Sequence, residues 1–161
     1  MGVIMFKNSA EIFAYIKKED VKLVDVRFTD LPGIQHHFNV PVESFDEAVF
    51  TDGLMFDGSS IRGFQAINES DMKLLPVPES AFIDPFRLEK TLVIIFSVHN
   101  PVDNSPYSRD PRGVVAKAVN YLKSTGIADQ AFFAPEAEFY VFDAIRFKTG
   151  MNEAYHHIDS Y

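Results

Sequence analysis

Two alternating runs of apolar and polar residues flank Leu31-Pro32-Gly33, and this arrangement constrains the fold most strongly. In residues 21–29 and 34–40, apolar and polar side chains alternate with a period of two, which is the period of a half-buried β-strand. A proline followed by a glycine is typical of a type II turn. The three segments together predict an antiparallel β-hairpin that is closed by such a turn.

A helix over residues 8–18 is expected before the hairpin, because Asn8 can cap it and Glu11 can complete a capping box. Shorter patterns predict a helical piece at 44–49 and strands at 71–78 and 91–98. The last of these strands is expected to be buried, because Leu92–Phe96 is an unbroken apolar run. Helix, hairpin and further strands predict an α+β domain of the β-grasp, ubiquitin-like kind.

The composition changes at residues 100–106, where Pro, Asp, Asn and Ser cluster, and we take this stretch as a domain boundary. Residues 1–104 would form the β-grasp domain, and residues 105–161 would begin a second domain.

This second part carries few elements of its own. A helix is expected from Asp110-Pro111 to Gly126, with a buried stripe formed by Val115, Ala118, Val119 and Leu122. Residues 132–142 are predicted to form a strand, followed by a polar tail. One helix and one strand cannot close a domain by themselves. We therefore expect residues 105–161 to be an incomplete domain, poorly stable when isolated.

The composition excludes several classes of function. A net charge of -8 repels phosphate backbones, so a nucleic-acid partner is not expected. The chain has no cysteine, which excludes disulfides, thiolate catalysis and sulfur-ligated metals. No run is long enough to span a bilayer, and residues 1–7 do not form a signal peptide. We expect a cytoplasmic protein without a membrane partner.

Glu136 and Glu138 lie two positions apart in the predicted strand, so both would face one side, about 7 Å apart. Carboxylates this close repel each other unless they are solvated or share cations. Oxygen ligands favour Mg²⁺ or Mn²⁺, and a pair of such ions is a common device for phosphoryl transfer. The alternative is an exposed strand face with ordinary glutamates, and the spacing alone leaves both readings open.

The loop Phe56-Asp57-Gly58-Ser59-Ser60 combines one acid, two hydroxyls and a flexible glycine. Such a loop could bind a cation or an amine through Asp57, or it could be a plain surface turn, since Asp, Gly and Ser are common turn residues.

The histidines and arginines carry no clear signal of chemistry. His36 and His37 are adjacent, so they would point to opposite faces of a strand and could not bind one metal together. We expect these two, together with His156 and His157, to be structural or surface residues. We assign no role to Arg87, Arg109 or Arg112, because arginines near helix starts more often make salt bridges.

Five motifs, taken in their order along the chain, resemble class I glutamine synthetases, most closely the bacterial, actinobacterial branch. They are Phe56-Asp57-Gly58-Ser59-Ser60-Ile61-Arg62-Gly63-Phe64, Asn68-Glu69-Ser70-Asp71-Met72, Asp84-Pro85-Phe86, Tyr107-Ser108-Arg109-Asp110-Pro111-Arg112 and Pro135-Glu136-Ala137-Glu138-Phe139-Tyr140-Val141-Phe142. The resemblance runs from about residue 6 to the end of the chain.

The resemblance implies a glutamate–ammonia ligase, which uses ATP to make glutamine through γ-glutamyl phosphate. It implies that Glu136 and Glu138 bind the active-site ions, two or more Mg²⁺ or Mn²⁺ per site. It places Asp57 in the ammonium site, where the carboxylate binds the cation and favours its deprotonation, and Ser60 near the substrate. It also implies two stacked hexameric rings with active sites between subunits, so that Asp57 and the two glutamates would serve different sites.

Some features depart from the family pattern. Family members are several times longer, so most ligands for metal, ATP and glutamate would lie beyond Tyr161, and we expect the 161 residues alone to be inactive. Ala134 stands where glycine is usual, Phe132 where tyrosine is common, and Tyr161 where the pattern commonly turns acidic. Two other hypotheses stay open: a non-catalytic β-grasp module that binds a partner, and a relative that joins glutamate to another amine.

Overall fold

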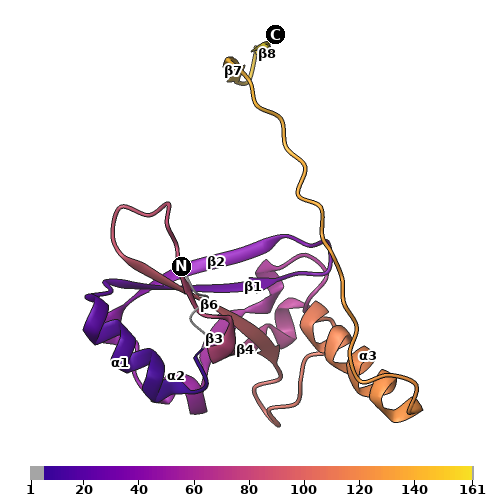
Figure 1. Cartoon of the computed structure of the whole chain (residues 1–161). Coiled ribbons are helices and arrows are strands. Elements are labelled where there is room, and N and C mark those ends of the chain that lie inside the picture. The colour runs from indigo at the N-terminus through magenta and orange to yellow at the C-terminus, as the bar shows by residue number, and fades with distance from the viewer. Residues whose placement is uncertain (1–5, 161) are drawn as a thin grey trace. The chain divides into compact units, whose positions relative to one another are not determined.

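The computed structural model describes residues 6–160 and divides the chain into two compact units that separate at Asp129–Gln130. The first unit is built around a mixed β-sheet, and the second is a short segment that ends in a hairpin (Figure 1). Each unit is described by itself below.

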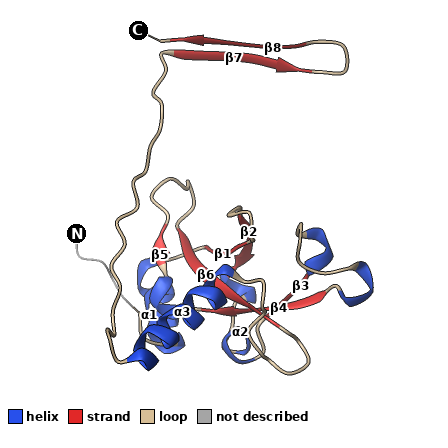
Figure 2. Cartoon of the chain, turned by 90° about the vertical axis from the view of Figure 1, so that its right-hand side faces the viewer, coloured by secondary structure: helices blue, strands red, loops and turns tan. Residues whose placement is uncertain are grey.

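The sheet of the first unit has the strand order β2-β1-β6-β4-β3, with the short strand β5 also paired to β6 (Figure 2). The strands are β1 (Leu23–Thr29), β2 (Gln35–Pro41), β3 (Leu54–Asp57), β4 (Asp71–Pro76), β5 (Phe82–Ile83) and β6 (Thr91–His99). The central pair β1 and β6 is parallel, and the other pairs are antiparallel. The predicted α+β, β-grasp architecture is confirmed.

The predicted hairpin is present, but its turn differs from the expected one. Strands β1 and β2 pair with Val26 opposite Phe38. The Gly33 N–H donates to the Asp30 carbonyl at 3.1 Å, so the turn begins at Asp30 and Gly33 is its last residue, with φ +93°. A type II turn with Pro32 and Gly33 at its centre is therefore wrong. Asp30 decides the register, because its side chain also accepts a hydrogen bond from the Ile34 N–H at 2.8 Å.

Helix α1 (Ser9–Glu19) begins as predicted at Asn8, whose side chain accepts from the Glu11 N–H at 3.0 Å. In the predicted capping box the Glu11 carboxylate would accept from the N–H of Asn8. It accepts instead from the N–H of the preceding residue, Lys7, at 2.8 Å. In place of one helical piece at 44–49, the chain forms a 3₁₀ turn, η1 (Val42–Ser44), and a short helix, α2 (Ala48–Thr51).

The hydrophobic core lies between α1 and one face of the sheet (Figure 1). Ile12 of α1 is fully buried, as are Val24 and Val26 of β1 and Leu92 and Ile94 of β6. The register places Val24 beside Leu92 and Val26 beside Ile94, so both strands send these side chains to the same face. Because β6 is buried on both faces from Thr91 to Ile94, its sequence begins as a continuous apolar run rather than an alternating one.

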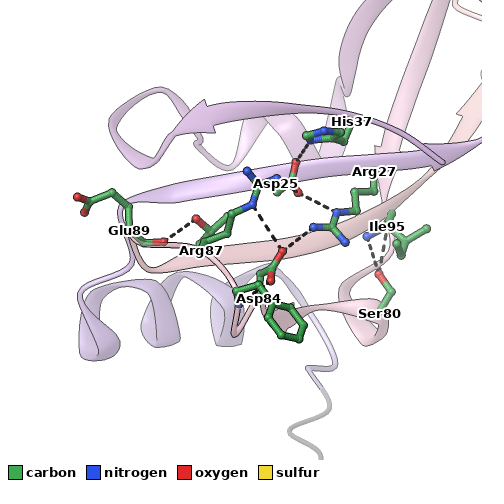
Figure 3. Close-up of polar contacts among 10 residues, drawn as sticks. Asp25, Arg27, His37, Ser80, Asp84, Arg87, Glu89 and Ile95 are labelled. Atoms are coloured by element: carbon green, nitrogen blue, oxygen red, sulfur yellow. Dashed lines mark hydrogen bonds and ion pairs between the residues drawn. The ribbon is translucent and has the colours of Figure 1, made fainter. Parts of the chain in front are cut away.

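The opposite face of β1 carries a buried ion-pair cluster that the sequence pattern did not predict (Figure 3). The Asp25 carboxylate is fully buried and accepts from Arg27 Nε at 2.8 Å, with His37 Nδ1 at 2.9 Å. Arg27 also donates to Asp84 at 2.8 Å, and Arg87 lies 3.6 Å from both carboxylates. Alternation along β1 puts Asp25 on the face opposite Val24 and Val26, and the segment after β5 covers this face.

Helix α3 (Pro111–Thr125) begins and ends where the sequence predicts. The Asp110 side chain accepts from the Arg112 N–H at 2.9 Å, and Gly126 ends the helix with φ +69°. The predicted buried stripe is wrong, since α3 has no buried residue; Val115 is 62% exposed, Val119 is 37% exposed, and Ala118 is exposed too. Leu122 is half-buried.

The second unit corrects two predictions. Residues 132–142 do not form a strand, because no strand among residues 6–160 offers them the hydrogen bonds that a strand needs. The expected polar tail instead folds into a hairpin of β7 (Ala144–Thr149) and β8 (Ala154–Asp159), with Phe147 opposite His156. In the part of the chain that is described, no helix is long and apolar enough to cross a membrane.

Candidate functional site

The candidate site in the first unit is the loop that follows β3 and carries Asp57 and Ser60. Asp57 ends β3, and residues Gly58–Ser60 form a 3₁₀ turn, η2. The Asp57 carboxylate accepts from the Ser59 N–H at 2.8 Å, the Ser59 hydroxyl at 2.6 Å and the Ser60 hydroxyl at 3.3 Å. The loop therefore presents an ionised, exposed carboxylate in a fixed orientation.

Gly58 fixes this loop to the neighbouring strand. Its N–H donates to the Ser70 carbonyl at 2.6 Å, just before β4 begins. A Cβ at this position would lie 2.5 Å from Met72 Cγ and 3.1 Å from the Ser70 oxygen. Glycine is needed here because the backbone approaches β4 closely, not merely because the loop is flexible.

Asp57 and Ser60 line one wall of a shallow hollow of about 300 Å³. Its other walls come from β1, β2 and the end of β3; the remaining lining residues are Phe28, His36, His37, Phe38, Phe56 and Ile61. The ring of His36 stacks on Phe28 with 5.4 Å between centroids, and its Nε2 lies 2.8 Å from the buried Asp30 carboxylate. The hollow joins an exposed acid to an aromatic surface, which suits a small cation.

The two adjacent histidines contact different carboxylates. His36 contacts Asp30, whereas His37 Nδ1 lies 2.9 Å from Asp25. The two side chains therefore have separate partners, while a shared metal site stays an expected absence. His156 and His157 lie on the exposed strand β8, as expected of surface residues.

Hydrogen bonds lower the pKa of Asp57. The Ser59 hydroxyl is the largest cause, followed by the Ser59 N–H, and Ser60 adds to them. A depressed pKa means that these bonds stabilise the folded chain above the pKa of the unfolded chain. That stabilisation is lost as the pH falls through the lower pKa of the folded chain.

A Ser59→Ala substitution is therefore expected to raise the pKa of Asp57 toward the ordinary aspartate value of about 3.9. The measurement is an NMR titration of the side-chain carboxyl carbons. Asp103 is an internal control, because Ser105 lowers its pKa by the same kind of bonds and it should not respond. An unchanged midpoint for Asp57 would contradict this assignment.

Glu136 and Glu138 lie in the second unit, on a segment without secondary structure, and both are exposed. Their oxygens are the ligand type that Mg²⁺ and Mn²⁺ prefer. Among the described residues, however, no group of three acidic or histidine side chains is placed to hold a metal ion. The residue types fit such an ion, but residues 6–160 do not assemble a complete set of ligands.

Comparison with known proteins identifies the family. The model of the glutamine synthetase β-grasp domain matches residues 20–101, and that of the glutamine synthetase catalytic domain matches residues 108–161. The glutamine synthetase of Frankia alni is 57% identical over 156 residues, which is 97% of this chain. This chain belongs to the glutamine synthetase family.

Other members of the family support this assignment. The glutamine synthetase of Mycolicibacterium smegmatis is 58% identical over 96% of this chain. Among solved structures, the cryo-EM structure of Plasmodium falciparum glutamine synthetase covers 99% of the chain with a TM-score of 0.78 and 23% identity, which shows the shared fold. The chain spans about a third of the length of these glutamine synthetases, 33% of the Frankia protein and 31% of the Plasmodium chain.

Three contacts around the site involve residues to which the sequence analysis gave no specific role. Asp30 holds His36, while Tyr107 and Arg109 donate to the backbone at the far end of the Asp57 loop. Arginines near helix starts more often make salt bridges, but the partners of Arg109 are the carbonyl oxygens of Gly63 and Phe64. No sequence spacing connects residue 109 to residue 63, so only the order of the family motifs could have drawn attention to it.

Proposed function

We propose that this chain supplies the β-grasp part of a glutamate–ammonia ligase, which makes glutamine from glutamate, ammonium and ATP through γ-glutamyl phosphate. Membership of the glutamine synthetase family, with 57% identity across 97% of the chain, is the observation that carries the proposal. The matched ranges, 20–101 and 108–161, support a division into residues 1–104 and 105–161.

In this proposal Asp57 binds the ammonium ion. Its hydrogen bonds to Ser59 and Ser60 keep the carboxylate ionised and oriented. The same bonds lower its pKa, which makes it a weak base. Its contribution is therefore a fixed negative charge that attracts the ammonium cation. Ser60 lies in the same hollow and holds one edge of the carboxylate.

Glu136 and Glu138 are proposed to supply two of the oxygen ligands for Mg²⁺ or Mn²⁺. The ions, when bound, neutralise charge on the transferring phosphoryl group. Both glutamates are exposed on an unpaired segment, which leaves their carboxylate oxygens accessible to an ion.

The proposal extends to assembly and location. We infer a cytoplasmic homo-oligomer of two stacked hexameric rings, in which the active site lies between subunits. Asp57 would then contribute to one active site, and Glu136 and Glu138 to another. The separation of the chain into two units, with these residues on different units, is compatible with such an arrangement.

The test is a chimera in which this chain replaces the matching third of the Frankia alni relative. An Asp57→Asn substitution in it is expected to raise the KM for ammonium roughly 10- to 100-fold, because one charge-assisted contact is lost. The KM values for glutamate and ATP should change little. Asp129→Asn, an exposed aspartate outside the hollow, is the matched control. An unchanged KM for ammonium in Asp57→Asn would contradict the assignment.

The same chimera separates the two other hypotheses. A non-catalytic interaction module predicts that the chimera assembles but does not make glutamine. A ligase for another amine predicts that a larger amine competes better than ammonium. Glutamine formation with ammonium as the preferred amine would exclude both.

A further inference from the structure

The backbone of the Asp57 loop is held together by its own hydrogen bonds. The Gly58 carbonyl accepts from the Ile61 N–H at 3.2 Å and from the Gln65 N–H at 3.4 Å, and the Ile61 carbonyl accepts from the Phe64 N–H at 3.0 Å. These bonds link the position of Phe64 to that of Gly58, the residue directly after Asp57.

Phe64 is held from outside the loop by Tyr107. The Tyr107 hydroxyl donates to the Phe64 carbonyl at 2.8 Å, and this bond is buried. The two rings also pack edge to face, with 5.2 Å between centroids. Burial raises the pKa of Tyr107, so the hydroxyl keeps its proton and stays a donor at neutral pH.

Arg109 adds a second external donor at the same place. Its Nη1 donates to the Gly63 carbonyl at 2.8 Å and also to the Phe64 carbonyl. Gly63 has φ +84°, a left-handed conformation in which its carbonyl turns toward the arginine. Two side chains from one segment thus converge on two consecutive carbonyls of the loop.

The segment that carries these donors is itself anchored to the centre of the sheet. The Tyr107 N–H donates to the Val98 carbonyl at 2.9 Å, and the Val98 N–H donates to the buried Asp110 carboxylate at 2.8 Å. Asp110 is also the N-cap of α3. The result is a continuous path of hydrogen bonds from β6 and α3, through Tyr107 and Arg109, to the Asp57 loop.

We infer that Tyr107 and Arg109 are positioning residues for the Asp57 carboxylate, and that they couple the start of the segment matched by the catalytic-domain model to the ammonium site. The role in ammonium binding rests on the proposed function. The clamp, by which we mean the hydrogen bonds from Tyr107 and Arg109 to the Gly63 and Phe64 carbonyls, does not. The clamp predicts that loosening the far end of the loop moves Asp57 without altering any group that touches ammonium.

The first test measures amide hydrogen exchange in the 161-residue chain with Tyr107→Phe and Arg109→Gln combined. The amides of Ile61, Phe64 and Gln65 are expected to exchange about tenfold faster, because the three hydrogen bonds from Tyr107 and Arg109 are lost. The amides of β1 should be unchanged, which shows that the domain stays folded. Arg112→Gln is the matched control, since the Arg112 guanidinium donates to the Ser97 hydroxyl at 3.4 Å, outside the Asp57 loop. Loop exchange within twofold of the original chain would overturn the clamp.

The second test measures steady-state kinetics of the chimera with the same substitutions. The KM for ammonium is expected to rise about tenfold, while the KM values for glutamate and ATP stay within about twofold. The single substitution Arg109→Lys, which retains a cationic donor group, should raise the KM for ammonium less than the double substitution does. A uniform change in all three KM values, or a fall in kcat alone, would overturn the positioning role.

The two tests separate failure of the inference from failure of the proposed function. If the unsubstituted chimera makes no glutamine, the proposed function and the role in ammonium binding both fall, and loop exchange alone decides on the clamp. If the chimera is active but only the exchange responds, Tyr107 and Arg109 hold the loop without serving ammonium.

Discussion

A Glu136→Gln substitution in the chimera is expected to reduce ATP-dependent glutamine formation by about 100- to 1,000-fold. Glutamine keeps the size of the side chain but removes the negative charge with which Glu136 is proposed to hold a divalent cation. Loss of one group that stabilises transition-state charge has an effect of this size. The measurement is the initial rate at saturating glutamate, ammonium and ATP, over a range of Mg²⁺ and Mn²⁺ concentrations.

The matched control for this substitution is Glu153→Gln in the turn between β7 and β8. Glu153 is exposed and pairs with Lys148, so the chemical change is the same but no role in the site is proposed for it. Its rate should stay within about twofold of the unsubstituted chimera. A Glu136→Gln chimera of near-normal activity would remove Glu136 from the metal site.

An Asp25→Ala substitution is expected to lower the free energy of unfolding of the chain by about 3–5 kcal/mol. Asp25 is fully buried, and its carboxylate is the shared partner of Arg27, His37 and Arg87. Without it, the Arg27 guanidinium keeps Asp84 but loses half of its neutralisation in a place that is only 18% exposed. Arg27 and Arg87 would then share the single carboxylate of Asp84, and incomplete pairing of charges at such a depth is unfavourable.

Urea denaturation followed by circular dichroism measures this effect. Asp25→Asn, which keeps the shape and some hydrogen bonding, should fall between the original chain and Asp25→Ala. Asp129→Ala is the control for loss of an exposed aspartate, with an expected change within about 0.5 kcal/mol. A change of less than about 1 kcal/mol for Asp25→Ala would show that the cluster contributes little to stability.

The elements predicted correctly are those whose signals are local. Asn8 and Asp110 cap their helices with their own side chains, and Gly126 ends α3 because it accepts a left-handed conformation. Alternation in β1 and β2 requires only that one face be apolar. Such signals act over a few residues, so they can be read without knowing where the rest of the chain goes.

Two of the wrong predictions, and the burial of Asp25, depend on distant partners. Residues 132–142 have strand-like composition, but a strand forms only where a neighbour takes its hydrogen bonds, and among the described residues it has none. The stripe on α3 has helical spacing, yet its burial depends on what packs against it. Asp25 alternates with apolar residues, but residues 84–87, nearly sixty positions later, cover it.

The sequence by itself determined the family, the β-grasp class and the identity of Asp57, Ser60, Glu136 and Glu138 as candidates, because ordered motifs and local periodicity carry that information. Only the tertiary structure decided that the turn begins at Asp30, that Asp25 lies in a buried ion-pair cluster and that Tyr107 and Arg109 hold the Asp57 loop. The physical reason for the last two is that their contacts join residues far apart in the chain. Their energies depend on burial and on partners that folding alone brings within hydrogen-bonding distance.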